Sequence, residues 1–331
     1  MLGKKDLLAN IFYKTGISRW SSRLSSHSCF VLNYHRIRAN QNHSTLFDEG
    51  VFGPSQQEFA AQIGWLNAHF EILSESDLVA IARGTVRLPG KSVVITFDDG
   101  YIDNYTLAYP ILRDANTPAI FFIPTLAIES RQLGWWDCLA YLLKITQKDT
   151  VYYRNRILKP REHYQESIHT VFQQIKEEHL PAKDILADLI AACEIDLPAR
   201  QIQGKELMTW EQLREVSQNN IAIGSHTHSH RILASLPLDR QSFELTESKQ
   251  IIEHHLGKPI HAMSYPVGHY NHFSPDTKRL AQEAGYDIAF SFFTGINDSS
   301  NFDPFDIRRI PVSSYLPRFI GGLQFPSLFL D

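Results

Sequence analysis

The sequence predicts an α/β fold in which parallel strands form a sheet or a barrel. Strand-like and helix-like segments alternate along most of its 331 residues, which is typical of parallel strands joined by helices. Two buried strand-like runs, 92–95 and 221–223, lead directly into polar residues. A chain of this length can form one α/β barrel with a sizeable core. We therefore expect a barrel-like domain with chemistry at the ends of its strands.

The first half of the chain contains three predicted strands and two predicted helices. The apolar run 29–34 predicts a strand that places His35 at its end. Ser55 and Glu58 form a capping box, which indicates that a helix begins there. After the 92–95 strand, Pro110 suits the first position of a short helix to about Ala115, and residues 119–123 form the next buried strand.

The last third of the chain repeats this alternation. Thr209 and Gln212 form a second capping box before the 221–223 strand. Ser274, with Pro275 at the first helical position, opens another helix, and Gly285 follows its end. Residues 288–290 and 307–312 are the predicted closing strands.

Between about residues 127 and 207 the pattern changes to apolar residues at helical spacing. They are Tyr164, Ile168, Val171, Phe172 and Ile175, followed after Pro181 by Ile185, Leu189 and Cys193. We interpret this segment as a helical insertion packed beside the barrel.

Charge and cysteine content exclude several classes of protein. The net charge is −4, so the chain lacks the basic footprint of a nucleic-acid binder. Cys29, Cys138 and Cys193 are too scattered for a disulfide framework or a cysteine metal site, which favours a reducing compartment. No signal-peptide pattern and no run of 18 apolar residues is present. We expect a cytoplasmic protein that can touch a membrane surface.

Two adjacent carboxylates, Asp98 and Asp99, follow shortly after the apolar run 92–95. Neighbouring carboxylates repel, so a fold keeps both only if a cation or a shared proton relieves them. His226 and His230 follow the other strand and are four residues apart, which on a helical turn gives a Cβ separation of about 5–6 Å. We expect these groups to meet around a divalent metal. His228 would point away, as a solvated or hydrogen-bonded loop histidine.

These residues carry a family resemblance. The run Thr-Phe-Asp-Asp-Gly at 96–100 and the run from His226 to His230 match the first two motifs of polysaccharide deacetylases of the NodB-homology family, carbohydrate esterase family four. A weaker match, Ser-Tyr-Pro-Val-Gly at 264–268, occupies the place of the third motif. The resemblance covers roughly residues 28–125 and 205–315.

The resemblance implies a distorted (β/α) barrel of the NodB-homology type, with a helical insertion. The deacetylase domain would span residues 28–315, interrupted by the insertion at about 127–207. Residues 1–27 would form an N-terminal segment, and residues 316–331 an apolar C-terminal tail. The tail could dock on the barrel, a partner or a membrane surface.

By resemblance, Asp99, His226 and His230 are the metal ligands and Asp98 is the general base. Zinc is the default ion for two histidines and a carboxylate, although other divalent ions fit similar ligands. A placed carboxylate can accept a proton from water during its attack. Alternatively, Asp98 only orients a histidine ligand.

Amide cleavage also needs an acid, because an amine leaves poorly unless it is protonated. The family often supplies a late histidine, but no histidine follows His272. His35 resembles the arrangement in relatives whose acid motif lies on the N-terminal side, and the first and last strands of a barrel are neighbours. A core or hydrogen-bonded histidine is the alternative.

Many relatives have an arginine, which supports the catalytic aspartate, where this chain has Ser264. Arg308 or Arg309, next to the closing strand, could substitute for it. Surface pairing of these arginines with Asp303 or Asp306 is the alternative.

Two further groups are candidates for substrate binding. In the third motif, Tyr265 and Pro266 precede Val267, whose N–H could face a developing oxyanion, or the segment is a plain turn. Trp135 and Trp136 open the insertion and could stack on sugar rings, although large aromatic residues also serve as core anchors.

The expected function is metal-dependent hydrolysis of N-acetyl groups on an amino-sugar-containing glycan or glycan precursor, as in exopolysaccharide biosynthesis. The expected partner is thus an acetylated glycan or sugar precursor, and not a nucleic acid. The alternatives are an O-acetyl esterase acting on a polysaccharide and a non-catalytic glycan-binding module.

Overall fold

The computed structural model describes residues 3–15, 27–41, 43–178 and 182–329. It divides into two compact units. Unit 1 comprises residues 1–41, 53–129 and 208–331, and unit 2 comprises residues 42–52 and 130–207. Residues 1–2 and 16–26 of the predicted N-terminal segment, 1–27, lie outside the described residues.

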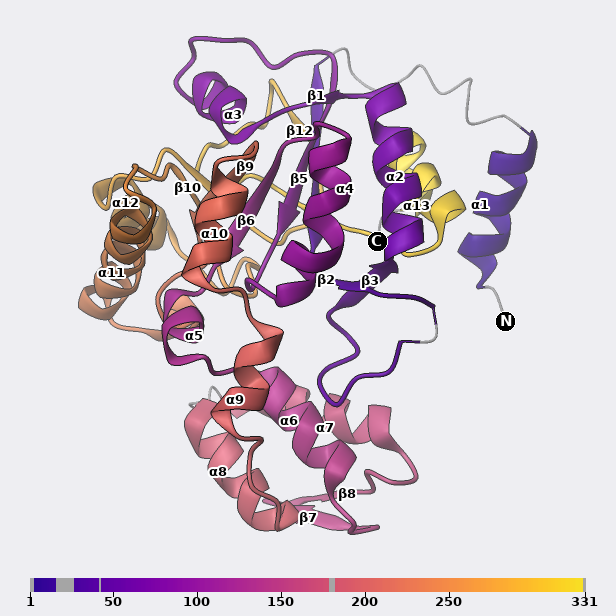
Figure 1. The fold of residues 1–331 in the computed structure, drawn as a ribbon, viewed down its shortest axis with the longest axis vertical. Coiled ribbons are helices and arrows are strands. Elements are labelled where there is room, and N and C mark those ends of the chain that lie inside the picture. The colour runs from indigo at the N-terminus through magenta and orange to yellow at the C-terminus, as the bar shows by residue number, and fades with distance from the viewer. Residues whose placement is uncertain (1–2, 16–26, 42, 179–181, 330–331) are drawn as a thin grey trace. The chain divides into compact units, whose positions relative to one another are not determined.

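Unit 1 is built on a curled sheet in which, among the described residues, nine strands take part (Figure 1). All pairs are parallel except β1 with β12. The strands in ladder order are β11 (Ile288–Phe290), β10 (Ala262–Ser264), β9 (Ile221–Ser225), β6 (Ala119–Ile123), β5 (Lys91–Phe97), β1 (Ser28–Tyr34) and β12 (Asn297–Asp298), with β4 (Glu71–Ile72) on β5 and β13 (Ile310–Pro311) on β1.

The segment 307–311 contacts β11, at one end of this ladder, and β1, which lies next to β12 at the other end. Ile307 bridges Phe290 of β11, and Ile310 and Pro311 pair with Leu32 and Asn33 of β1. The expected α/β barrel is thus present in distorted form. The closing strand predicted at 307–312 is shorter than expected, because only β13 and this single bridge are paired.

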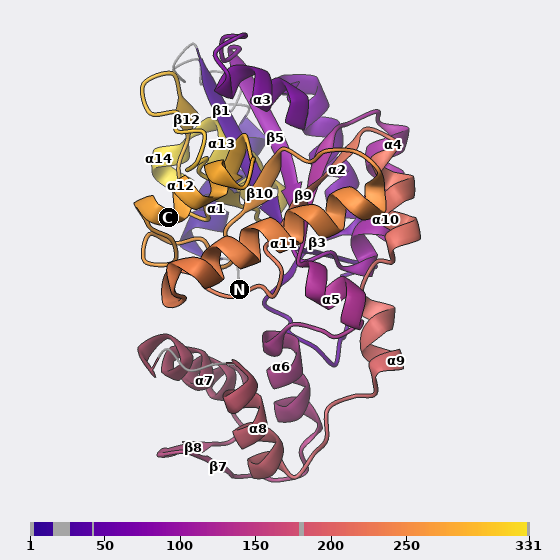
Figure 2. The ribbon, with the colours of Figure 1, turned by 90° about the vertical axis from the view of Figure 1, so that its left-hand side faces the viewer.

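Helices cover the outside of the curled sheet (Figures 1 and 2). They are α2 (Gln56–His69), α3 (Glu75–Ala82), α4 (Tyr109–Asp114), α5 (Thr125–Ser130), α10 (Trp210–Ser217), α11 (Leu238–Leu256) and α12 (Pro275–Glu283), with the 3₁₀ turn η4 (Leu233–Ser235). The capping boxes predicted at Ser55 and Thr209 are formed, and α12 begins after Ser274 as predicted. A small ladder pairs β2 (Arg36–Arg38) with β3 (Phe52–Ser55).

The helix predicted at Pro110 begins earlier than expected. A π-helical turn, η2 (Asn104–Ala108), precedes α4, and the N–H of Tyr109 donates to the carbonyl of Asn104. Pro110 has no N–H to continue that wide pattern, so the α-helical pattern takes over there.

The apolar C-terminal tail docks on the barrel. It forms α13 (Leu316–Gln324) and α14 (Pro326–Phe329), and the side chains of Phe319, Ile320 and Leu323 are buried. Near the N-terminus, α1 (Lys4–Thr15) packs on α13 (Figure 1). Among the described residues, we find no helix with the length and apolar character needed to span a membrane.

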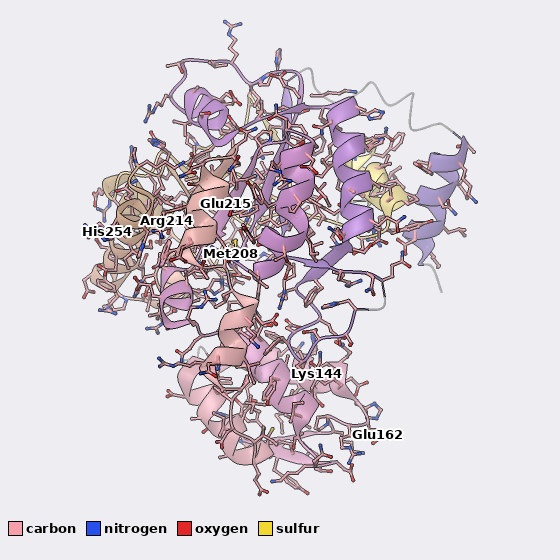
Figure 3. The ribbon with its side chains drawn as sticks, in the orientation of Figure 1. Lys144, Glu162, Met208, Arg214, Glu215 and His254 are labelled. Atoms are coloured by element: carbon pink, nitrogen blue, oxygen red, sulfur yellow. The ribbon has the colours of Figure 1, made fainter. Side chains whose placement is uncertain are left out.

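Unit 2 is a helical cluster with a small hairpin. It contains α6 (Trp135–Ile145), α7 (Tyr164–Glu178), α8 (Ala182–Cys193) and α9 (Arg200–Gln203), with the 3₁₀ turn η3 (Gly204–Glu206), and the hairpin pairs β7 (Val151–Tyr153) with β8 (Arg156–Leu158). The helices predicted from periodicity are α7 and α8. Lys144, labelled in Figure 3, donates to the carbonyls of Thr45 and Phe47, which ties the distant segment 42–52 to this unit.

Candidate active site

The predicted functional residues of unit 1 follow neighbouring parallel strands. Because the carboxyl ends of parallel strands share one edge of a sheet, β1, β5 and β9 deliver His35, Asp98 and His226 to the same place. The register pairs the last residue of β1, Tyr34, with the last residue of β5, Phe97. His35 and Asp98 are therefore the next residues of two adjacent strands.

Three side chains form a candidate metal centre. Asp99, His226 and His230 each offer a ligand atom, and these atoms all lie within 4.8 Å of one another. The Asp99 Oδ1 atom is 3.4 Å from His230 Nε2 and 3.7 Å from His226 Nε2. Two imidazoles and a carboxylate are a common protein ligand set for zinc.

The surroundings of the two histidines suit metal binding. His226 Nδ1 lies 2.8 Å from the carbonyl oxygen of Ser264, so this nitrogen carries the hydrogen and Nε2 keeps its lone pair. Burial lowers the pKa of His226 and lowers that of His230 further. Both imidazoles are therefore neutral near pH 7, which is the form that binds a metal.

The predicted helical turn between these histidines is wrong. Residues 226–230 form a loop, in which Thr227 and His230 have left-handed backbone angles, with φ of 63° and 54°. The two imidazole rings nevertheless lie close together, with centroids 4.6 Å apart. His228 points elsewhere, and its Nδ1 lies 2.8 Å from Thr125 Oγ1, as the hydrogen-bonded interpretation predicted.

Left-handed residues recur around the site. Asp99 has a φ of 76° and Val267 a φ of 60°. Such angles are unfavourable for residues other than glycine, and most of all for β-branched ones such as Thr227 and Val267. Strained backbone of this kind gathers at functional sites, where the surrounding structure holds it in place.

Asp98 is buried and held on both carboxylate oxygens. Arg309 donates to Oδ1 at 2.8 Å, and the amide of Asn33 donates to Oδ2 at 3.0 Å. Burial alone would raise the pKa of Asp98. The Arg309 guanidinium, together with the smaller effects of His226 and His35, outweighs burial, so the pKa of Asp98 lies below the usual range. The carboxylate is therefore ionised across the neutral pH range.

Arg309 takes the place left by the missing arginine of the third motif. Its guanidinium is 1% exposed and also donates to the hydroxyl of Ser264 at 2.7 Å. Surface pairing, the alternative for this arginine, is wrong, because Asp303 and Asp306 accept from Lys278 instead. The guanidinium of Arg308 lies over the ring of Phe293.

His35 is half-buried at the end of β1. Its carbonyl accepts a hydrogen bond from the Asn104 amide at 2.7 Å, and its ring centroid is 6.4 Å from that of Phe292. Burial lowers the pKa of His35 to about 4, although the nearby charge of Asp98 acts in the opposite direction. The imidazole is therefore neutral in the resting site, and its acid role stays a prediction.

The residues of the third motif lie in two different environments, the core and a tight turn. The ring of Tyr265 is fully buried, stacks on Phe273 at 4.3 Å and donates from its hydroxyl to the Phe305 carbonyl. Tyr265 is thus a core residue. Pro266 accepts from the N–H of Gly268 in a tight turn, and the oxyanion role of the Val267 N–H stays a prediction.

Trp135 and Trp136 pack inside unit 2. Trp136 is 8% exposed, and Trp135 lies 5.3 Å from the ring of Phe172. These contacts show that both tryptophans serve as core anchors, which was the alternative to sugar stacking in the sequence analysis. A sugar-binding role for this pair has no support from them.

Asn33 is a residue that the sequence reasoning missed. The sequence signal for it was a polar amide in the otherwise apolar run 29–34, in the strand next to the one that carries Asp98.

A backbone contact that the sequence could not reveal supports the turn after Asp99. Met208, labelled in Figure 3, donates its N–H to the carbonyl of Gly100 and so tethers the turn that follows Asp99.

Comparison with known proteins identifies the family. The family model described as polysaccharide deacetylase matches residues 85–289, which is more than half of the chain. This chain belongs to the polysaccharide deacetylase family of hydrolases. The matched range includes Asp98, Asp99, His226 and His230 but neither His35 nor Arg309.

Individual polysaccharide deacetylases are similar to parts of the chain. A Bacillus subtilis (strain 168) relative named polysaccharide deacetylase YxkH is 23% identical over 284 residues, covering 86% of this chain and 71% of the relative. The poly-beta-1,6-N-acetyl-D-glucosamine N-deacetylase of Staphylococcus aureus (strain N315) is 37% identical over 113 residues, covering 31% of this chain and 38% of that protein.

Solved structures show the same fold. IcaB from Ammonifex degensii superposes with a TM-score of 0.59 at 19% identity and covers 90% of this chain and 97% of that one. The Streptococcus pyogenes deacetylase PplD gives a TM-score of 0.58 at 18% identity, with coverage of 88% and 94%. The predicted NodB-type barrel is confirmed.

Proposed function

We propose that this protein hydrolyses N-acetyl groups on an amino-sugar-containing glycan or glycan precursor, using a divalent ion held by Asp99, His226 and His230. The observation that carries the proposal is the complete set of three candidate metal ligands beside Asp98, a buried carboxylate that is fixed in position and can act as the base. Asp98 is ionised, fixed by Arg309 and Asn33, and its Oδ2 lies 3.9 Å from His226 Nε2. The N-deacetylase name of the Staphylococcus aureus relative supports an amide substrate.

The ligand set fits a divalent cation, with zinc as the default. When bound, such an ion supplies a Lewis acid for the acetyl group and activates water near neutral pH. The protein's own residues do the rest. The geometry of the ligands is set by the ends of β5 and β9, and the carbonyl of Ser264 orients His226.

Asp98 is proposed to accept a proton from the attacking water, whose oxygen forms a bond with the acetyl carbon. The carbon–nitrogen bond then breaks, and His35 delivers a proton to the departing nitrogen, so that acetate and a free amine result. Because the resting His35 is neutral, it must gain this proton during the reaction, and the proton that Asp98 has taken from water supplies it, so that Asp98 returns to its ionised form. Arg309 acts as a positioning residue, since it touches Asp98 rather than the reacting atoms.

A second candidate is hydrolysis of an O-acetyl ester on a polysaccharide. The low pKa of His35 favours it, because an alcohol leaves more easily than an amine and depends less on a protonated acid. A purely binding role is disfavoured by the intact set of Asp98, Asp99, His226 and His230.

Acetate release tests the proposal. The purified protein, with zinc added after chelation, is assayed on N-acetylated oligosaccharides and on an O-acetylated polysaccharide, beside Asp98→Asn and the double variant His226→Ala, His230→Ala. We expect acetate from the N-acetylated substrate, metal loss in the double variant, and a kcat loss on the order of 10²-fold in Asp98→Asn with its metal retained.

The other outcomes are equally informative. Acetate from the O-acetylated substrate alone would establish the esterase. Absence of acetate from both substrates, with metal bound and glycan retained on a column, would establish a binding module. Stoichiometric metal in the double variant would show that these histidines are not the ligands.

A further inference from the structure

Helix α1 carries apolar residues on two sides, one buried and one exposed. Its inner side packs on the C-terminal helix α13 (Figure 1). On this side Ala9 is 1% exposed, and the ring of Phe12 lies 5.2 Å from that of Phe325 and 6.0 Å from that of Phe329. These contacts fix the orientation of the helix within unit 1. They also determine which residues face outward.

The outward side carries Leu7, Leu8 and Ile11, which are 57%, 37% and 48% exposed. Their spacing of one and four residues places them on one side of a helix. Single exposed apolar residues are ordinary, but three on adjacent turns form a continuous patch. We call these three residues the outer face of α1.

Lysines flank this outer face. Lys4 lies three residues before Leu7 and Lys14 three residues after Ile11, so both belong to the same side, and both are exposed. The acidic residue of the helix, Asp6, lies on another side and is paired with Arg318 at 3.3 Å. The helix has three lysines and one aspartate, whereas the whole chain carries −4.

We propose that the outer face of α1 docks on an anionic membrane surface. Leucine and isoleucine side chains would enter the boundary between headgroups and acyl chains, and the Lys4 and Lys14 ammonium groups would lie among lipid phosphates. The charge pattern favours lipid over a second copy of this chain, because two copies joined through this face would bring their lysines together.

The chemistry also determines the character of this binding. A short helix with three apolar side chains and two flanking lysines gives weak, reversible attachment that needs both the apolar and the ionic contribution. The ionic contribution falls off within a Debye length, so added salt releases the protein. The proposal does not depend on the enzymatic activity.

Vesicle co-sedimentation of the full chain tests the proposal, with phosphatidylcholine vesicles and with vesicles that also contain phosphatidylglycerol, at low and high salt. We expect binding to the phosphatidylglycerol vesicles at low salt only. Leu7→Ser with Ile11→Ser, and separately Lys4→Glu with Lys14→Glu, should each weaken binding by at least about fivefold. Val86→Ser with Lys91→Glu is the matched control, since both residues are exposed elsewhere on unit 1.

Circular dichroism and thermal unfolding confirm that each variant is folded. Failure of the wild-type protein to bind phosphatidylglycerol vesicles at low salt would overturn the proposal. An equal loss of vesicle binding in the control variant Val86→Ser with Lys91→Glu would also overturn it. If Leu7→Ser with Ile11→Ser left vesicle binding unchanged and instead lowered the mass measured by light scattering, the outer face would be an interface between copies.

Discussion

At the scale of single residues, the pairing of Asp98 with Arg309 decides the state of the proposed base. Both groups are almost fully buried, and their nearest atoms are 2.8 Å apart. Removing one partner of a buried ion pair leaves an uncompensated charge, which costs more than the pair contributes. The carboxylate therefore depends on Arg309 both for its ionisation and for its place.

We expect Arg309→Met to lower activity most strongly at acidic pH. Without the guanidinium, burial raises the pKa of Asp98, so the base becomes protonated as the pH falls through a higher value. The free energy of unfolding should fall by about 3–5 kcal/mol. The pH profile of kcat/KM and urea unfolding measure these effects. Arg308→Met is the matched control, and a similar shift of its pH profile would contradict the assignment.

His35 tests the amide interpretation. We expect His35→Gln to slow hydrolysis of an N-acetylated sugar severely, because the nitrogen must be protonated before it leaves. Cleavage of an activated acetyl ester should fall much less, since a good leaving group needs little help. Steady-state rates on both substrates provide the measurement. Equal losses would instead assign His35 to substrate binding or structure.

The same histidine should make stability depend on pH. Its pKa is about 4 in the folded protein and 6.5 as the ordinary value, so the unfolded chain binds more protons between these values. The metal-free wild-type protein should therefore lose stability as the pH falls from 6.5 towards 4. In His35→Gln this loss should be smaller. Urea unfolding at several pH values measures it, and identical pH slopes would show that His35 is not held neutral.

At the scale of elements, the position of His226 at the end of β9 depends on how closely β9 packs against β6 and β10. Gly224 lies in β9, two residues before His226. A Cβ atom at this position would lie 2.6 Å from the ring of Phe122 in β6 and 2.8 Å from the Ala262 carbonyl in β10. Only glycine therefore allows β9 to fit between its neighbours and deliver His226 to the site.

We expect Gly224→Ala to lower both stability and metal affinity. Overpacking of this kind typically costs about 1–3 kcal/mol, and a displaced β9 moves His226 away from Asp99. Thermal unfolding and metal titration measure the two losses. Gly64→Ala is the control, because this α2 position has nothing within 4 Å and alanine favours a helix. Normal metal affinity in Gly224→Ala would contradict the argument.

At the scale of the whole molecule, the candidate metal centre belongs to one unit alone. Asp99, His226 and His230 all lie in unit 1. A ligand that binds only the folded state stabilises the part of the protein that holds it. Unit 2 has its own apolar core, built on Leu139, Leu142, Val151, Val171 and Leu189.

Metal removal should thus act unevenly on the two units. We expect a chelator to increase amide hydrogen exchange in peptides from β5 and β9, with little change in α6 and α8. Mass spectrometry of the exchanged protein measures this difference. The variant His226→Ala, His230→Ala should exchange like the chelated protein. Equal changes in both units would show that they unfold together.

Much of the fold was predictable because its signals are local. Capping boxes at Ser55 and Thr209 depend on residues three positions apart, and the buried strand 119–123 is a continuous apolar run. Long-range features were not predictable in this way. The segment 42–52 joins unit 2 through Lys144, far along the chain, and the loop at His226 takes left-handed angles that a spacing of four residues cannot reveal.

The sequence by itself determined the α/β class, the helical character of the insertion and the residue types of the site. Periodicity, helix caps and motifs depend only on residues that are close together in the sequence. Only the tertiary structure decided that Arg309 rather than Arg308 reaches Asp98, that Asn33 holds its other oxygen and that Tyr265 is a core residue. The physical reason is that pairing of β1 with β5 and with β13 brings together residues that are distant in the sequence. Asn33 and Asp98 are 65 positions apart, and Asp98 and Arg309 are 211 positions apart.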